Sequence, residues 1–220
     1  MLRNEKVVLN SRQLPFRWYS AWKAVRGMNY EIAYAIEDAM NISTKNLPRL
    51  DGTTVIACDN SGSMTFDPIS KHSDIYPIDI AALLGAVAVG LCERRLVYVF
   101  GEDIARVYVS DHDTILKNTE RIKNTDVGHS TNAYKVMRAM IDDNVHTDRL
   151  IVLTDMVTYD DSYNYNSERD FKYLLEQYRQ DTNNVSVISG WNQEILSYIK
   201  YTSDTKGGSL VEQIDKVKLN

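Results

Sequence analysis

The sequence predicts an α/β protein in which a doubly wound, mostly parallel sheet is preceded by an N-terminal helical extension. From residue 54 onward, short apolar runs alternate with longer segments of helical periodicity. Alternating β and α units of this length are typical of a parallel sheet that helices cover on both faces. The first 49 residues differ, because their apolar side chains recur at helical spacing.

Local signals place each element. Residues 54–58 (TVIAC) form an apolar run that we expect as the first strand, and Pro77 stands near the first turn of a helix expected over 77–94. Two β-rich runs, 96–100 and 104–109, are separated by Gly-Glu-Asp, which indicates a tight, hairpin-like connection. The later elements are expected as a short helix over 113–122, a helix over 132–143, a strand over 150–154, a helix over 167–180, a strand over 185–188, a short strand or helical turn over 195–202, and a closing helix over 210–217.

The N-terminal segment predicts two helices of its own. Their apolar positions are Phe16, Tyr19 and Trp22, with Lys23 beside them, and then Ile32, Ala35, Ile36, Ala39 and Met40. We therefore expect a division into a helical extension over residues 1–49 and an α/β domain over residues 50–220.

The charge of this segment is opposite to that of the rest of the chain. It holds eight Lys or Arg against four acidic residues, whereas the whole chain carries a net charge of −5. The helices either dock through their apolar faces or form a basic surface for an anionic partner. The second interpretation makes Arg12, Arg17 and Arg26 candidate RNA contacts.

Composition favours a globular protein with a sizeable core, because 44% of the 220 residues are hydrophobic. No stretch has the length of a membrane span, and the longest apolar candidate, 78–91, is interrupted by Asp79. The first residues are polar and charged, without the apolar segment of a signal peptide. We expect a cytoplasmic protein with neither a membrane nor DNA as a partner.

Cys58 and Cys92 lie in apolar settings and are expected as buried thiols.

The segment 55–64 (VIACDNSGSM) carries the main functional signal. Asp59, Ser61 and Ser63 form the pattern D-x-S-x-S after the first strand, where open α/β sheets bind ligands. Thr131, in GHSTN, and Asp155, which follows the apolar run 150–154, are expected at the same edge. Hard cations prefer such oxygen ligands and retain several waters. These five residues are therefore a candidate site for Mg²⁺ or Mn²⁺.

Each part of the set also has an ordinary structural role open to it. Asp59 suits a turn or a helix cap after a strand. Thr131 stands where the N-cap of the following helix is expected. Asp155 suits a solvated strand end. The convergence of three separate chain positions favours a metal site over three independent roles.

This constellation resembles the metal-ion-dependent adhesion site (MIDAS) of von Willebrand factor A domains. That site consists of D-x-S-x-S, a downstream Thr and a downstream Asp, and all five positions are filled here. The resemblance implies a Rossmann-like α/β fold, a bound Mg²⁺ or Mn²⁺, and a partner carboxylate that completes the metal's octahedron.

The flanking sequence is similar to the C-terminal part of Ro/TROVE proteins. The similarity rests on NEKVVLNSRQLPFRWYSAWKAV, on IEDAMNISTKNLPRLDG, and on the metal motif that follows. In that family a ring of helical repeats leads into a von Willebrand factor A domain, and Y RNAs and the ends of misfolded RNAs bind mainly to the ring. Most of the ring has no counterpart in these residues.

Three classes of function follow from these patterns. The first is a magnesium-dependent ligand-binding module of a Ro-like protein, which contacts an acidic residue of a protein partner within a ribonucleoprotein. The alternative is direct binding of a small noncoding RNA through the basic N-terminal segment. The third is a Mg²⁺-dependent phosphotransfer enzyme, but Ser61 stands where a second carboxylate would serve as general acid or base, and the sequence has no G-x-x-x-x-G-K-[ST] loop. We therefore expect no enzymatic activity.

Overall fold

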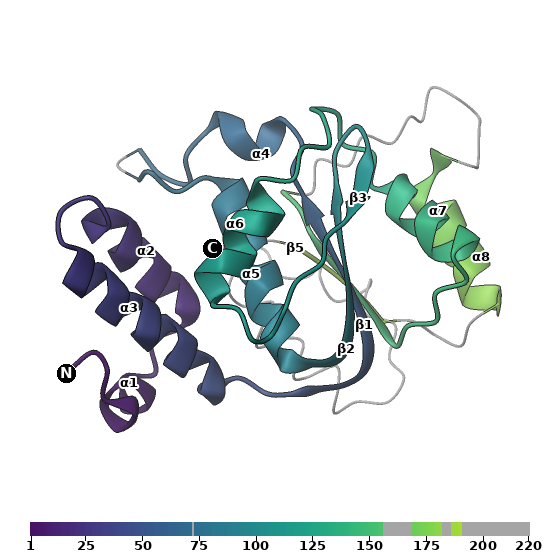
Figure 1. The fold of residues 1–220 in the computed structure, drawn as a ribbon. Helices are drawn as coiled ribbons and strands as arrows, with labels where there is room; N and C mark the ends of the chain where they lie inside the picture. Colours follow the sequence, from purple (N-terminus) through teal and green to yellow (C-terminus); the bar gives the residue numbers. More distant parts are fainter. Residues whose placement is uncertain (72, 156–168, 182–185, 191–220) are drawn as a thin grey trace, which may run out of the picture.

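A five-stranded sheet forms the centre of the part of the chain that the computed structural model describes, residues 1–71, 73–155, 169–181 and 186–190 (Figure 1). The strands are β1 (Leu50–Asp59), β2 (Cys92–Phe100), β3 (Ile104–Arg106), β4 (Arg149–Leu153) and β5 (Ser186–Gly190), in the order β3-β2-β1-β4-β5. The pairings β2–β1, β1–β4 and β4–β5 are parallel, and β3 pairs antiparallel with β2. The doubly wound, mostly parallel fold is confirmed.

Helices cover both faces of this sheet. Their bounds are α1 (Glu5–Ser11), α2 (Pro15–Val25), α3 (Tyr30–Ser43), α4 (Ser63–Phe66), α5 (Pro77–Leu91), α6 (Ile115–Lys123), α7 (Tyr134–Asp142) and α8 (Phe171–Asp181). Helices α5 and α6 lie on one face and α7 and α8 on the other, while α2 and α3 form a further layer outside α5 and α6 (Figure 1). None of the helices in the described ranges is both long and apolar enough to cross a membrane.

Strand β1 divides the core into two clusters, because successive side chains of a strand point to opposite faces. Ile56 and Cys58 pack with the apolar residues of α5, and Val55 and Ala57 pack with those of α7. Helix α5 is buried on nearly every side, since it lies between the sheet and the helices α2 and α6. Both cysteines are free and buried, as expected.

The N-terminal helices share the core of the sheet layer. Tyr19 of α2 and Met40 of α3 are buried in the same cluster as Ile56 and the residues of α5. An apolar face of these helices is therefore docked, while most of their charged side chains remain outside.

Several expected bounds differ from the structure. The helix expected over 77–94 ends at Leu91, because Cys92 and Arg94 pair with Leu50 and Thr53 in the β1–β2 ladder. Helices α1 and α4 were not expected, and the strand expected over 104–109 ends at Arg106. The elements expected over 195–202 and 210–217 lie outside the described residues.

One buried carboxylate joins three helical segments. Asp79 of α5 is completely buried. Its Oδ1 accepts hydrogen bonds from the Tyr19 hydroxyl at 2.9 Å and from Lys123 Nζ at 2.7 Å. Its Oδ2 accepts from Lys23 Nζ at 2.8 Å and from the Tyr76 N–H at 3.0 Å. A buried charge is tolerated only when it is paired and hydrogen-bonded, so this network fixes α2 and α6 against α5.

The network determines the ionisation of Asp79. Burial disfavours the charged carboxylate, but hydrogen bonds from Lys123, Lys23 and the Tyr76 N–H outweigh burial and lower the pKa of Asp79. Burial and the neighbouring Asp79 charge raise the pKa of Tyr19, which remains a donor. A lowered folded-state pKa adds stability above the unfolded value of about 4. That stability is lost as the pH falls through the folded value.

Replacing Asp79 with Asn should lower the free energy of unfolding at pH 7 by about 3 kcal/mol, because two ammonium groups lose their buried partner. Urea unfolding of the full chain measures this loss. The difference from wild type should narrow as the pH falls below about 4.

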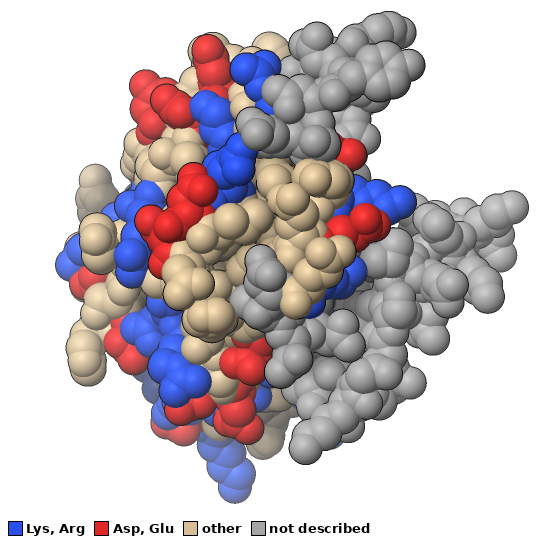
Figure 2. All heavy atoms as spheres, turned by 90° about the vertical axis from the view of Figure 1, so that its right-hand side faces the viewer, with Lys and Arg blue, Asp and Glu red and all other residues tan. Residues whose placement is uncertain are grey.

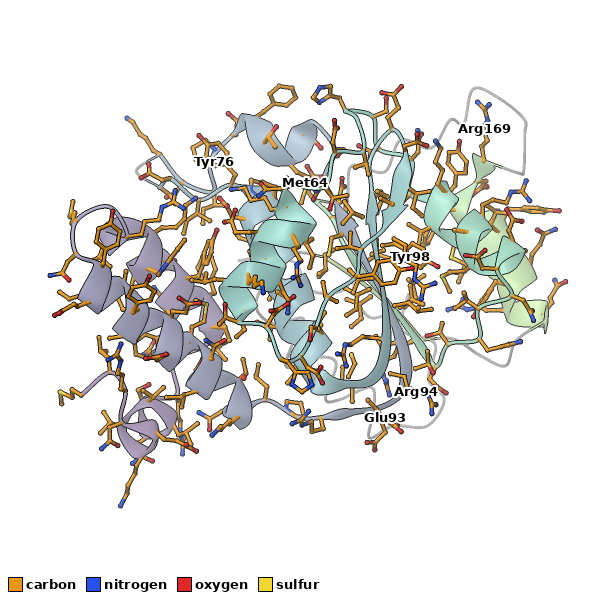
Figure 3. The ribbon with its side chains drawn as sticks, viewed as in Figure 1. Met64, Tyr76, Glu93, Arg94, Tyr98 and Arg169 are labelled. Atoms are coloured by element: carbon orange, nitrogen blue, oxygen red, sulfur yellow. The ribbon has the colours of Figure 1, made fainter. Side chains whose placement is uncertain are left out.

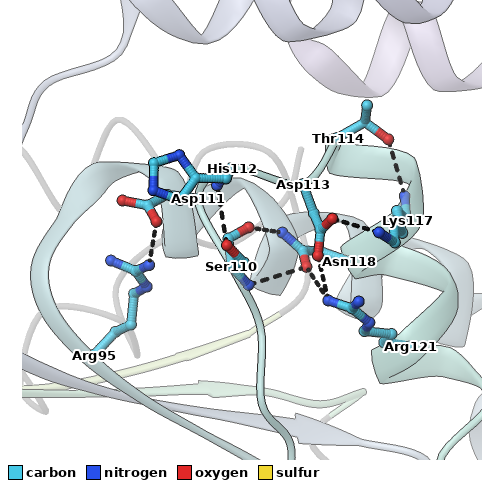
Figure 4. A network of polar contacts seen from close by, with 9 residues as sticks. All are labelled: Arg95, Ser110, Asp111, His112, Asp113, Thr114, Lys117, Asn118 and Arg121. Atoms are coloured by element: carbon cyan, nitrogen blue, oxygen red, sulfur yellow. Dashed lines mark hydrogen bonds and ion pairs between the residues drawn. The ribbon is translucent and has the colours of Figure 1, made fainter.

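The control for this prediction is Asp113→Asn. Asp113 also accepts hydrogen bonds from two cations, Lys117 and Arg121 (Figure 4). The side chains of these cations are 58% and 39% exposed, more than those of Lys23 and Lys123 at Asp79. Ion pairs in solvent contribute little, so this variant should lose much less stability. Equal losses in the two variants would show that Asp79 is not the anchor of these helices.

Candidate metal centre

Asp59, the last residue of β1, is completely buried at the carboxyl edge of the sheet. Its Oδ1 accepts a hydrogen bond from the Ser61 N–H at 2.8 Å, and its Oδ2 accepts one from the Thr154 hydroxyl at 2.7 Å. The pairing of Cys58 with Leu153 sets this contact, because it brings the next residues of β1 and β4 side by side. Sequence reasoning missed Thr154, although its position directly before Asp155 was the available signal.

The ionisation of Asp59 reflects a crowded, buried site. Burial raises its pKa, the hydrogen bonds from Ser61 and Thr154 lower it in part, and the negative charge of Asp155 raises it further. The Asp155 charge is the smallest of these influences on Asp59. A divalent cation beside these carboxylates would offset both the burial and the repulsion.

The two serines of the motif turn their hydroxyls toward each other. Ser61 Oγ lies 3.2 Å from Ser63 Oγ, and Ser61 is buried whereas Ser63 is partly exposed. Ser63 opens the short helix α4, whose Met64 is completely buried beneath it (Figure 3). Met64 thus anchors the loop that presents the hydroxyl oxygens.

The loop that carries Thr131 lies against this motif. The Gly62 N–H donates to the carbonyl of His129 at 2.8 Å. Thr131 is buried two residues further along. The alternative role of Thr131 as a helix cap is excluded, because α7 begins at Tyr134 and its N-cap position is Ala133.

Asn60 is a second residue that sequence reasoning missed. Its Nδ2 lies 2.8, 3.1 and 3.0 Å from the carbonyl oxygens of Ile122, Lys123 and Thr125. These contacts tie the motif to the end of α6, since the last carbonyls of a helix lack partners within it. A pocket of about 240 Å³ opens there, lined by residues that include Ser61 and Lys123.

The donor set suits a hard cation. In the described ranges no three Asp, Glu, His or Cys side chains gather in a way that would hold a metal ion. The candidate set instead combines two carboxylates with hydroxyls, the oxygen chemistry that Mg²⁺ takes together with waters. Asp59 uses its oxygens for two hydrogen bonds, and a carboxylate has about four acceptor positions. Acceptor capacity therefore remains for metal-bound water.

The structure brings Asp59, Ser61, Ser63 and Asp155 to one edge of the sheet, and the loop that carries Thr131 lies against them.

The candidate RNA contacts lie elsewhere, on the N-terminal helices, and all three are exposed. Arg12 is the C-cap of α1, Arg17 lies on α2, and Arg26 caps α2. The Arg26 guanidinium lies over the Trp22 ring, 5.1 Å from its centroid.

The fold is similar to that in the crystal structure of the Deinococcus radiodurans RO (RSR) protein. The TM-score is 0.70 at 15% sequence identity, over 92% of this chain. The match covers 47% of the other chain, so this chain spans about half its length. No protein-family model and no curated protein matches the sequence. At this identity the likeness establishes the α/β fold.

Replacing Asp59 with Asn should leave the metal-free chain at least as stable as wild type. The change removes a buried charge, while the amide can still hydrogen-bond to Ser61 and Thr154. Wild type should gain about 2.7 kcal/mol of unfolding free energy when Mn²⁺ exceeds its Kd a hundredfold. Asp59→Asn should gain far less, as urea unfolding with and without Mn²⁺ would measure.

The matched control is Asp51→Asn, which changes an exposed acid at the opposite end of β1. It should retain the full Mn²⁺ effect. An equal Mn²⁺ effect in Asp59→Asn and wild type would remove Asp59 from the site.

Proposed function

We propose that this protein is a magnesium-dependent ligand-binding module of a Ro-like protein, which contacts a protein partner within a ribonucleoprotein. The observation that carries the proposal is the convergence of two serine hydroxyls, 3.2 Å apart, with the buried Asp59, on which the Asp155 charge acts. The likeness in fold to the Deinococcus RO protein supports the Ro-like part of the proposal.

The five residues have different roles in this proposal. Ser61, Ser63 and Thr131 hold the cation through neutral hydroxyl oxygens, and Asp59 and Asp155 bind it or accept hydrogen bonds from its waters. When bound, the cation supplies an electron-poor position that attracts an anionic ligand. We propose that this ligand is the carboxylate of an Asp or Glu on the partner.

The arrangement favours binding over catalysis. A general base must lie within hydrogen-bond reach of the reacting group and titrate near the working pH. Apart from Asp59 and Asp155, which are the proposed metal ligands, the described side chains with hydrogen bonds at the motif are the neutral groups of Asn60, Thr65 and Thr154. His129 contributes its backbone carbonyl to Gly62, and the residue is otherwise exposed. A phosphotransfer role therefore has little support.

Acetate should bind weakly to the full chain when Mg²⁺ or Mn²⁺ is present and should not bind without it. Ser63→Ala should weaken both cation and acetate binding by about tenfold or more, because it removes a metal ligand. Isothermal titration with Mn²⁺ alone, and then with acetate, measures the two steps.

Ser70→Ala, at an exposed serine in the loop after α4, is the control and should behave as wild type. Acetate binding that does not depend on the cation would contradict the proposal. Phosphatase or nuclease turnover that Asp59→Asn abolishes would favour the enzyme instead.

A second candidate function is direct binding of a small noncoding RNA by the N-terminal helices. The observations that favour it are the exposed Arg12, Arg17 and Arg26 of this segment and the Arg26 guanidinium over the partly buried Trp22 ring. On the face formed by α7 and α8, by contrast, basic and acidic side chains are interspersed among the described residues (Figure 2). That face therefore carries no separate RNA proposal.

If this surface binds RNA, affinity for a structured RNA should fall steeply with salt, because phosphate contacts release counterions. Reversing Arg12, Arg17 and Arg26 to Glu should reduce the slope of log K against log salt by roughly 0.7 to 0.9 for each phosphate that an arginine no longer neutralises. Arg94→Glu, at the end of the sheet opposite to Met64, is the control (Figure 3). No RNA binding at low salt would exclude this function.

A further inference from the structure

The carboxyl edge of the sheet carries one unusual apolar side chain. Phe66, the last residue of α4, is 78% exposed, although Met64 on the same short helix is completely buried. The other exposed large hydrophobic residues of the described ranges lie within residues 1–34, after β3 and on α8. Among the described residues, Phe66 is thus the exposed large hydrophobic side chain that stands beside the metal motif.

The Phe66 ring lies against the middle of that motif. A Cβ atom placed on Gly62 would lie 3.6 Å from Phe66 Cε2 and 3.3 Å from the His129 carbonyl oxygen. Gly62 separates the two candidate ligands Ser61 and Ser63, so the ring lies beside the backbone that joins them. Ser63 and Phe66 are also three residues apart on α4, a spacing that places them on the same side of a helix.

The surroundings leave room for a ligand that is larger than a single carboxylate. The pocket of about 240 Å³ extends along Gly62, Thr65 and His129 toward the end of α6. Gly62 has no side chain to close it, and His129 is exposed at its rim. The Phe66 ring does not line this pocket but stands next to it, at Gly62, which the pocket and the ring share.

We propose that Phe66 is a specificity residue, which selects partner segments whose metal-bound acidic residue is flanked by a large apolar residue. The inference rests on the proposed metal-dependent function. The cation attracts the acidic side chain by charge, and the exposed ring buries the neighbouring apolar side chain. Charge alone would accept any exposed Asp or Glu, whereas the ring adds a second requirement.

The test compares two capped tripeptides on the Mg²⁺-loaded full chain by NMR titration. One has a leucine on one side of the glutamate and a glycine on the other, and the second has glycine on both sides. The leucine peptide is made in both orders, with leucine before or after the glutamate. Wild type should bind the better leucine peptide about five- to twentyfold more tightly, the scale of partly burying one apolar side chain. Phe66→Ser should reduce this ratio to about one and leave the glycine peptide unchanged.

Tyr108→Ser is the matched control, because Tyr108 is an aromatic residue that is 80% exposed but lies after β3. It should keep the wild-type ratio. If both peptides bind wild type equally, or if Phe66→Ser keeps the preference, the role of Phe66 is overturned while the metal site stands. If Mn²⁺ titration shows no cation binding at all, the proposed function fails and this inference fails with it.

Discussion

The parallel pairing of β1 with β4 is the constraint on which the candidate site depends. Its register places Asp59 beside Thr154, and the hydroxyl of Thr154 and the N–H of Ser61 then hold the carboxylate in a fully buried position. A carboxylate in such a position is unfavourable unless other groups compensate it. The neighbouring charge of Asp155 increases the need for compensation. The local fold thus creates a position in which a divalent cation would be stabilising, and the serine hydroxyls supply further oxygen ligands.

A second buried carboxylate connects this edge to the N-terminal helices. Asp79 binds Lys23 of α2 and Lys123 of α6, and Lys123 in turn offers its carbonyl to Asn60 in the metal motif. The helical extension, the layer of α5 and α6, and the candidate site therefore share one polar network. Displacing α2 would remove Tyr19 and Lys23 from Asp79, whose other cationic partner, Lys123, also lines the pocket beside Ser61. The N-terminal helices therefore help to hold the candidate metal site in place.

Sequence patterns predicted the parallel strands and most of the helices, because the apolar runs of a buried sheet and the periodicity of its helices are local signals. They did not predict where α5 ends, since the pairing of Arg94 with Thr53 overrides the local helical pattern. Asp59, Ser61 and Ser63 could be predicted from the sequence because they belong to one short motif. The contacts of Thr154 and Asn60 could not be predicted, because they depend on strand register and on the end of a distant helix. The side-chain partners of Asp79 come from segments 44 to 60 residues away, so no local pattern reveals them.

The measurement that tests the central claim most directly is anomalous diffraction from crystals of the full chain grown with Mn²⁺. The account predicts one strong Mn²⁺ peak at direct coordination distance from the hydroxyl oxygens of Ser61 and Ser63. It also predicts that Asp59 and Asp155 contact this ion or its waters. A chain that binds Mn²⁺ only at a different group of residues, or a motif that stays without a peak at saturating Mn²⁺, would contradict the account.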